Sequence, residues 1–184
     1  DPLQTVAQPQ MTPEQINAMV ARLAERMQDN PDDMQGWLML ARSYKTMGRY
    51  EEATRAFDRA GKLVDEDPHL LSEYAEALAL ATGGSLRGRP SELLARALKL
   101  DPDFPDALVL AGTAAYERED YAAAAAYWER LLKRLPPDSE DARVLSESVG
   151  KARAEVDRGG RLADATFLVG DGDDTGEWTA TSFG

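Results

Sequence analysis

The feature that most constrains the fold of this chain is an internal repeat at a fixed offset. One segment reads Trp37–Tyr44 and continues with Gly48-Arg49-Tyr50, Ala53, Phe57 and Ala60. A second segment has the matching pattern Leu108–Gly112, Ala115, Asp120-Tyr121, Ala124, Trp128 and Leu131. Three prolines also recur 34 residues apart, at Pro68, Pro102 and Pro136. Self-similarity with this period indicates a stack of short equivalent units.

A 34-residue unit with these Trp/Leu, Gly/Ala, Tyr, Ala, Phe and Pro positions is typical of the tetratricopeptide repeat, a pair of antiparallel helices. The sequence therefore predicts an all-α fold, a right-handed solenoid of three helix pairs. The predicted repeats span residues 34–67, 68–101 and 102–136, with 65–67 as a short insertion. Such arrays hold a peptide or a helix of another protein, so a binding function is expected.

Single helices are predicted on both sides of the repeats. Thr12-Pro13-Glu14-Gln15 has the residues of a capping box with a proline in the first turn, which favours a helix over 12–29 after a flexible lead-in at 1–11. Asp138–Asp141 opens an end helix over 138–158. Gly159-Gly160 is expected to end it, leaving an acidic, Gly- and Asp-rich tail at 159–184 that is expected to be irregular.

The second repeat departs from the pattern. Residues 82–90 contain three glycines and a proline, which cannot continue a helix, so its second helix is expected to start near Pro90. When the second repeat is aligned so that its second helix starts near Pro90, Leu78 occupies position eight of the repeat. The residue at this position is usually small, so that the two helices can touch. This helix pair is therefore expected to pack less closely than its neighbours.

Positions 5, 9 and 12 of each repeat form a stripe expected to line the concave groove. The stripe gives the groove a basic end, a small-residue middle and an apolar-aromatic end, which suits an amphipathic guest helix. Arg42 and Lys45 are suited to a peptide carboxyl terminus, or else are ordinary solvated residues. The predicted groove residues are Leu38, Arg42, Lys45, Ala75, Ala79, Thr82, Val109, Thr113 and Tyr116.

The composition and net charge of the chain argue against several classes of function. The net charge of −12 argues against a nucleic-acid partner. The chain has no cysteine, and its one histidine, His69, has no second histidine beside it, so no metal, cofactor or catalytic site is predicted. No run approaches the roughly 18 apolar residues of a membrane span. The chain does not begin with Met, which suggests a mature product or part of something longer.

Several stretches resemble one family, the periplasmic tetratricopeptide domain of the c-type cytochrome biogenesis protein that chaperones apocytochrome c. The resemblance covers about residues 11–155, and its most specific part is the off-consensus loop Gly83–Pro90. The other matching stretches are Met19–Arg26, Asn30–Asp33, Gly36–Tyr44, Gly48-Arg49-Tyr50, Leu71–Ala79, Ala97–Pro102, Asp120-Tyr121, Tyr127–Leu132 and Leu135–Glu140.

The resemblance implies a non-enzymatic module that captures the C-terminal segment of apocytochrome c and presents it to the haem lyase complex, whose other subunits are further partners. It also implies a periplasmic domain, anchored to the inner membrane only through segments outside this chain. One alternative is a related role in the maturation of formate-dependent nitrite reductase. Others are a scaffold that joins subunits of an assembly complex and a general cytoplasmic adaptor. The carboxylate clamp of chaperone-binding repeats needs Lys and Asn where Leu38 and Arg42 stand, so that clamp is absent.

Overall fold

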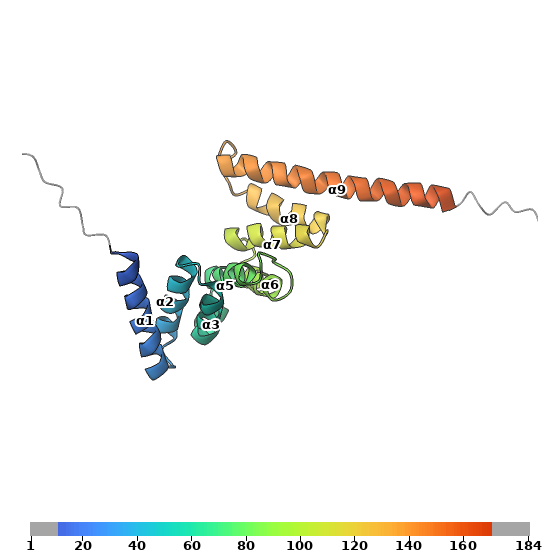
Figure 1. Ribbon diagram of the computed structural model, residues 1–184. Helices are drawn as coiled ribbons and strands as arrows, with labels where there is room; N and C mark the ends of the chain where they lie inside the picture. Colours follow the sequence, from blue (N-terminus) through green and yellow to red (C-terminus); the bar gives the residue numbers. More distant parts are fainter. Residues whose placement is uncertain (1–10, 171–184) are drawn as a thin grey trace, which may run out of the picture.

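The computed structural model describes residues 11–170, which form helices joined by turns and contain no strand (Figure 1). Three antiparallel pairs, α2/α3, α5/α6 and α7/α8, pack one on the next, and α1 and α9 flank them. The helices are α1 (Pro13–Asp29), α2 (Met34–Thr46), α3 (Tyr50–Ala60), α4 (Lys62–Asp65), α5 (Pro68–Ala81), α6 (Arg89–Leu100), α7 (Pro105–Glu117), α8 (Tyr121–Leu132) and α9 (Glu140–Gly170). The predicted all-α tetratricopeptide solenoid is confirmed.

Capping side chains explain where several helices begin. Thr12 and Gln15 form the predicted capping box at the start of α1. Asp33 accepts the backbone N–H of Gly36 at the start of α2, and Asp67 accepts those of His69 and Leu70 at the start of α5. An Asp at this position satisfies N–H groups that lack a partner inside the helix. Asp33 and Asp67 are 34 residues apart, so they set the alignment of the second repeat on the first.

That alignment corrects the predicted register of the second repeat. In the first helices of the two repeats, Trp37 and Ala41 correspond to Leu71 and Ala75, 34 residues further on. In the second helices, the buried Ala53, Phe57 and Ala60 correspond to the buried Pro90, Leu94 and Ala97, 37 residues further on. The extra residues therefore lie in the loop between α5 and α6 and not at 65–67, which belong to α4 and the turn after it.

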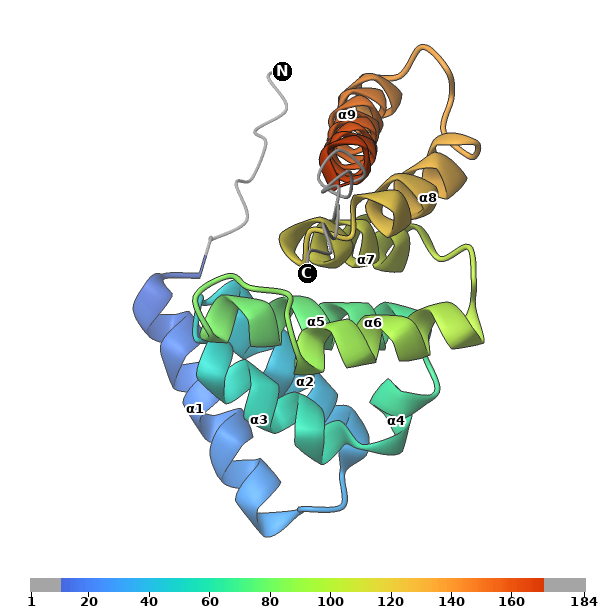
Figure 2. The same cartoon turned by 90° about the vertical axis from the view of Figure 1, so that its right-hand side faces the viewer.

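The α5–α6 loop is held in place by the third repeat. Gly83, Gly84 and Gly88 adopt positive φ angles that residues with a Cβ rarely adopt. The carboxylate of Glu117, at the end of α7, accepts the backbone N–H of Leu86 at 2.9 Å and the hydroxyl of Ser85 at 3.1 Å. Leu86 is buried. The loop is thus an ordered part of the solenoid that joins the second repeat to the third (Figure 2).

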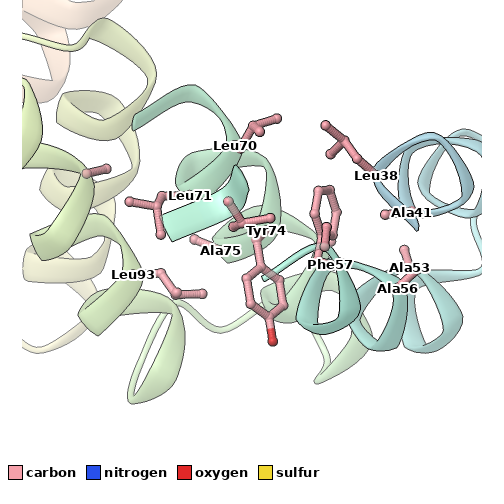
Figure 3. Close-up of a cluster of buried hydrophobic side chains, with 14 of the residues drawn as sticks. Leu38, Ala41, Ala53, Ala56, Phe57, Leu70, Leu71, Tyr74, Ala75 and Leu93 are labelled. Atoms are coloured by element: carbon pink, nitrogen blue, oxygen red, sulfur yellow. The ribbon is translucent and has the colours of Figure 1, made fainter. Parts of the chain in front are cut away.

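Small residues lie where the two helices of each pair cross. Ala41 and Ala75 are fully buried at this position, and Gly112 is buried at the equivalent place in the third pair. Figure 3 shows Ala41 facing Ala53 and Ala56 across the first pair. The expected loose packing around Leu78 was wrong, because Ala75 and not Leu78 occupies position eight.

The second pair is joined to the first by Tyr74. Its ring stacks on Phe57 with 5.4 Å between ring centroids (Figure 3). Its hydroxyl donates to Asp58 Oδ1 at 2.6 Å, and Arg89 pairs with the same oxygen at 2.6 Å. Trp37, Tyr74 and Trp128 are buried, and Tyr44 is partly buried.

The end helix is longer than predicted. Its buried stripe consists of Ala142, Leu145, Val149 and Ala152. The helix nevertheless continues through Gly159-Gly160 to Gly170, so the expected break is wrong. A glycine inside a helix costs about 1 kcal/mol relative to alanine but does not forbid it. Residues 171–184 and 1–10 lie outside the described range. Within 11–170, no helix is long and apolar enough to cross a membrane.

Candidate functional site

The first helices of the three pairs, α2, α5 and α7, share one face of the solenoid. We call this face the A-helix groove. Two neighbouring cavities open on it. The N-terminal cavity, about 630 Å³, lies between α1 and α2. The central cavity, about 300 Å³, is lined by side chains of α2, α5 and α7 alone.

The N-terminal cavity is mainly apolar. Its walls include Ile16 and Val20 from α1 and Leu38, Met39 and Met47 from the first repeat and the turn after α2. Met39 is the most exposed of these, at 59%. A flexible, polarisable methionine adapts its shape to different apolar guests. This cavity therefore offers a place for a large apolar side chain of a partner.

Most of the residues that line the central cavity have charged or titratable side chains, and Val109 and Leu110 add apolar surface. Lys45 Nζ lies 2.5 Å from Glu76 Oε2. His69 lies between two carboxylates, 3.8 Å from Glu73 Oε2 and 3.7 Å from Asp106 Oδ2. The His69 ring also packs edge-on against Phe104, with centroids 6.1 Å apart. The acidic groups thus come from both α5 and α7.

One ion pair stands between the two cavities. Arg42 lines the N-terminal cavity and Glu73 lines the central cavity, and Arg42 Nη2 lies 2.7 Å from Glu73 Oε2. Arg42 is 45% exposed, whereas Glu73 is only 19% exposed. A guest carboxylate that took Arg42 would leave Glu73 with His69 as its remaining ionic neighbour among the described residues.

Four of the predicted groove residues line these cavities. Leu38 and Arg42 line the N-terminal cavity, and Lys45 and Val109 line the central one. Two residues of the third repeat do not line either. Thr113 donates its hydroxyl to the carbonyl of Val109, and Tyr116 packs against Tyr121 and Trp128.

Of the three predicted groove residues of the second repeat, Ala75 and Ala79 were placed wrongly, and Thr82 lines neither cavity. Ala75 is fully buried at the helix crossing, and Ala79 is 4% exposed. Thr82 caps the end of α5 and donates its hydroxyl to the carbonyl of Leu78. The cause is the three-residue error in register. The middle of the groove therefore carries charged side chains of α5 instead of small ones.

Sequence reasoning missed the residues that take their place. Glu76 occupies position nine of the second repeat once Asp67 is aligned with Asp33, so the two capping aspartates would have revealed it. His69, for which no site was predicted, is half-exposed and lines the central cavity. Ile16 and Val20 were missed because α1 stands outside the repeats. A helical pattern in α1 shows which of its residues share an apolar face. It does not show that a cavity remains between this face and α2.

Over residues 11–170, no group of three or more His, Cys, Asp or Glu side chains is placed to hold a metal ion. The two cavities adjoin, so an extended guest can span both. Together the fold and the groove define the class of protein, a tetratricopeptide domain.

Comparison with known proteins identifies the family. The family model of the cytochrome c-type biogenesis protein H TPR domain matches residues 3–142. The chain belongs to this family. It is 35% identical over 153 residues to the cytochrome c-type biogenesis protein CycH of Pseudomonas aeruginosa, a match covering 83% of this chain and 38% of that protein. It is also 29% identical over 131 residues to the formate-dependent nitrite reductase complex bifunctional subunit NrfFG of Haemophilus influenzae, covering 71% and 33%. The chain thus spans well under half the length of these relatives.

Solved structures agree on the fold. MamA superposes with a TM-score of 0.61 at 12% identity, over 80% of this chain and 92% of that one. The TPR2B domain of yeast Sti1, from its complex with pHsp70, superposes with a TM-score of 0.56 at 21% identity, over 66% and 97%. At these identities the likeness establishes a tetratricopeptide fold alone.

Proposed function

We propose that this domain is the peptide-binding part of a c-type cytochrome biogenesis protein. It captures the C-terminal helix of apocytochrome c and presents the apoprotein for haem attachment, without catalysing a reaction itself. The family membership supports the biogenesis role. The observation that carries the binding role is the A-helix groove, in which an apolar cavity adjoins a charged one.

The chemistry of the chain agrees with a carrier role. Covalent haem attachment uses a Cys-x-x-Cys-His motif, and this chain has no cysteine. The reactive motif therefore has to come from the partner. A helix that lays its apolar face into a groove is a common mode of peptide recognition, and it leaves the rest of the partner chain free. Holding the apoprotein by its C-terminal helix keeps a haem-binding motif elsewhere in its chain accessible to the haem lyase subunits.

The resemblance to the periplasmic family also supports a proposal for where the domain is located. We place the domain in the periplasm, where c-type haem attachment by this family takes place. In the full-length protein it is anchored to the inner membrane by segments outside this chain. Its neighbours there are other subunits of the haem lyase complex.

Calorimetric titration with a peptide of the last twenty or so residues of an apocytochrome c tests this proposal. We expect saturable one-to-one binding to the wild-type domain and none with a scrambled peptide. Val109→Lys places a charge in the central cavity and should weaken binding about tenfold or more. Val156→Lys is the matched control, because Val156 on α9 is exposed to nearly the same extent, 42% against 40%. No binding to the wild type, or equal losses in the two variants, would contradict the proposal.

A second candidate is maturation of formate-dependent nitrite reductase, which the similarity to the Haemophilus influenzae subunit supports. The same titration with the C-terminal peptide of that reductase separates the two. The proposed function requires the apocytochrome c peptide to bind more tightly. The scaffold alternative predicts that neither peptide binds.

A further inference from the structure

The side chains of the N-terminal cavity and of the central cavity indicate which properties a bound helix must have, in addition to the source named in the proposed function. We propose that the A-helix groove selects an amphipathic helix with large apolar side chains at one end and a lysine or arginine about four turns away. The apolar end enters the cavity between α1 and α2, and the cationic end lies against Asp106. The proposal deepens the proposed function and rests on it only for the natural source of the helix.

Exposed apolar side chains in the N-terminal cavity indicate where the apolar end of the guest binds. Met39 is 59% exposed and Ile16 is 38% exposed, yet both line the same cavity of about 630 Å³. The buried Leu38 and Val20 form further parts of its wall. Large apolar side chains that converge on an open cavity gain from covering by a partner, at about 25 cal/mol for each Å² of apolar surface removed from water. Since α1 supplies one wall, the binding site includes a helix outside the three repeats.

The carboxylates of the central cavity indicate where the cationic end of the guest binds. In the central cavity Lys45 pairs with Glu76, and Arg42 pairs with Glu73 from the neighbouring cavity. Within the described part of the chain, Asp106 has only the imidazole of His69 beside it, at 3.7 Å. Of the carboxylates that line the central cavity, Asp106 is therefore the one that pairs with no lysine or arginine of the described residues. The net charge of −12 also steers a cationic guest toward the domain.

The spacing follows from helix geometry. Neighbouring helices of such a stack lie roughly 10 Å apart. α2 and α5 are joined by the ion pairs Arg42–Glu73 and Lys45–Glu76, and α5 packs on α7, so the distance from the α1–α2 seam to α7 is roughly 20–25 Å. A helix rises 1.5 Å per residue, so this distance corresponds to about 13–17 residues, or roughly four turns. The ion pair Arg42–Glu73 lies on this path. The groove thus selects a guest helix both by the chemistry of its two ends and by the distance between these ends.

Designed peptides test the proposal without any cytochrome sequence. Two helices of about twenty residues carry leucines on one face at one end and lysines about four turns away, in the two possible chain orders. A third has glutamine in place of each lysine. We expect one of the lysine peptides to bind the wild-type domain saturably by fluorescence anisotropy, and the glutamine peptide to bind at least about threefold more weakly at low salt.

Matched variants locate the two ends. Met39→Lys and Ile16→Lys should each weaken binding about tenfold or more, whereas Val144→Lys on α9, where Val144 is 54% exposed, should not. Asp106→Asn should weaken binding by a factor that shrinks with added salt. Asp141→Asn removes the same charge from the first turn of α9 and should have little effect. Melting curves check that each variant is folded.

The outcomes separate this proposal from the proposed function. Failure of both lysine peptides to bind, or equal losses in Met39→Lys and Val144→Lys, overturns it. So does an apocytochrome c peptide that binds the wild type and Met39→Lys equally well, although the proposed function then stands. If the designed helix binds in the groove and the apocytochrome peptide does not bind at all, the proposed function fails and the selectivity of the groove stands.

Discussion

Replacing Gly112 by alanine should destabilise the domain, although alanine is the better helix former. Gly112 lies in the middle of α7 where α8 crosses it. A Cβ at this position would lie 2.7 Å from Trp128 Cε2 and closer still to Nε1 and Cδ1. Ordinary contacts between such atoms are about 3.5–4.0 Å, so the indole or α7 must move by about 1 Å.

The expected magnitude is a difference of two effects. Overpacking a closely packed site costs about 1–3 kcal/mol, and replacing a helical glycine by alanine returns about 1 kcal/mol. The Trp128 indole is rigid, buried, and donates from Nε1 to the carbonyl of Val109 at 3.3 Å, so its movement also weakens a hydrogen bond. We expect a net loss of about 1–2 kcal/mol in the free energy of unfolding, which is a fall of roughly 3–6 °C in Tm for a domain of this size.

Thermal and urea unfolding followed by circular dichroism measure this change. Gly150→Ala is the matched control, because Gly150 is also helical, in α9, and a Cβ there would meet nothing within 4 Å. That variant should gain about 0.5–1 kcal/mol. If Gly112→Ala proved as stable as the wild type, or if the two variants changed in the same direction, the close crossing of α7 and α8 would be refuted.

Three further substitutions have definite expectations. Ala79→Trp should lower Tm by several degrees, because Ala79 is buried; an unchanged melt would place it on the surface. Glu119→Gly should raise Tm by about 1–3 °C, because Glu119 has a φ of 64° where the first repeat has Gly48; a lower Tm would argue against strain there. Burial, helped by Asp58, raises the pKa of Tyr74 above its unfolded value of about 10, so its stabilisation is present below that pH and lost above it. Tyr74→Phe should cost about 1 kcal/mol at neutral pH and flatten the loss of stability above about pH 10 in urea titrations. An unchanged slope above that pH would mean that Tyr74 does not cause the loss.

The fold was predictable because repeat motifs report helix packing directly. Most of the residues that recur between Trp37–Ala60 and Leu108–Leu131 are buried where the helices of a pair meet, and burial requires the same residue types in each unit. The start of α1 was predictable for a local reason, since a capping box needs only four consecutive residues. The continuation of α9 through Gly159-Gly160 was not, because a glycine inside a helix costs only about 1 kcal/mol and does not forbid it.

The groove was predictable only where the register was right. Pro68 and Pro102 are 34 residues apart but have different roles: Pro68 is the first residue of α5, whereas Pro102 precedes α7, which begins at Pro105. Their equal spacing concealed the longer α5–α6 loop and moved the predicted groove onto the buried Ala75 and Ala79. The charged central cavity depends on side chains from α2, α5 and α7 meeting in space. A period along one chain does not show which of them face each other.

Mapping backbone amide shifts on an isotope-labelled domain, as an apocytochrome c C-terminal peptide is added, tests the central claim most directly. If the A-helix groove captures that helix, the changes will concentrate on groove residues of α2, α5 and α7, such as Met39, Glu73 and Val109. Residues of the second helices that face away from the groove, such as Arg55 in α3 and Arg96 in α6, will keep their positions in the spectrum. An unchanged spectrum, or changes confined to α3, α6 and α8, would contradict capture of the apocytochrome helix in this groove.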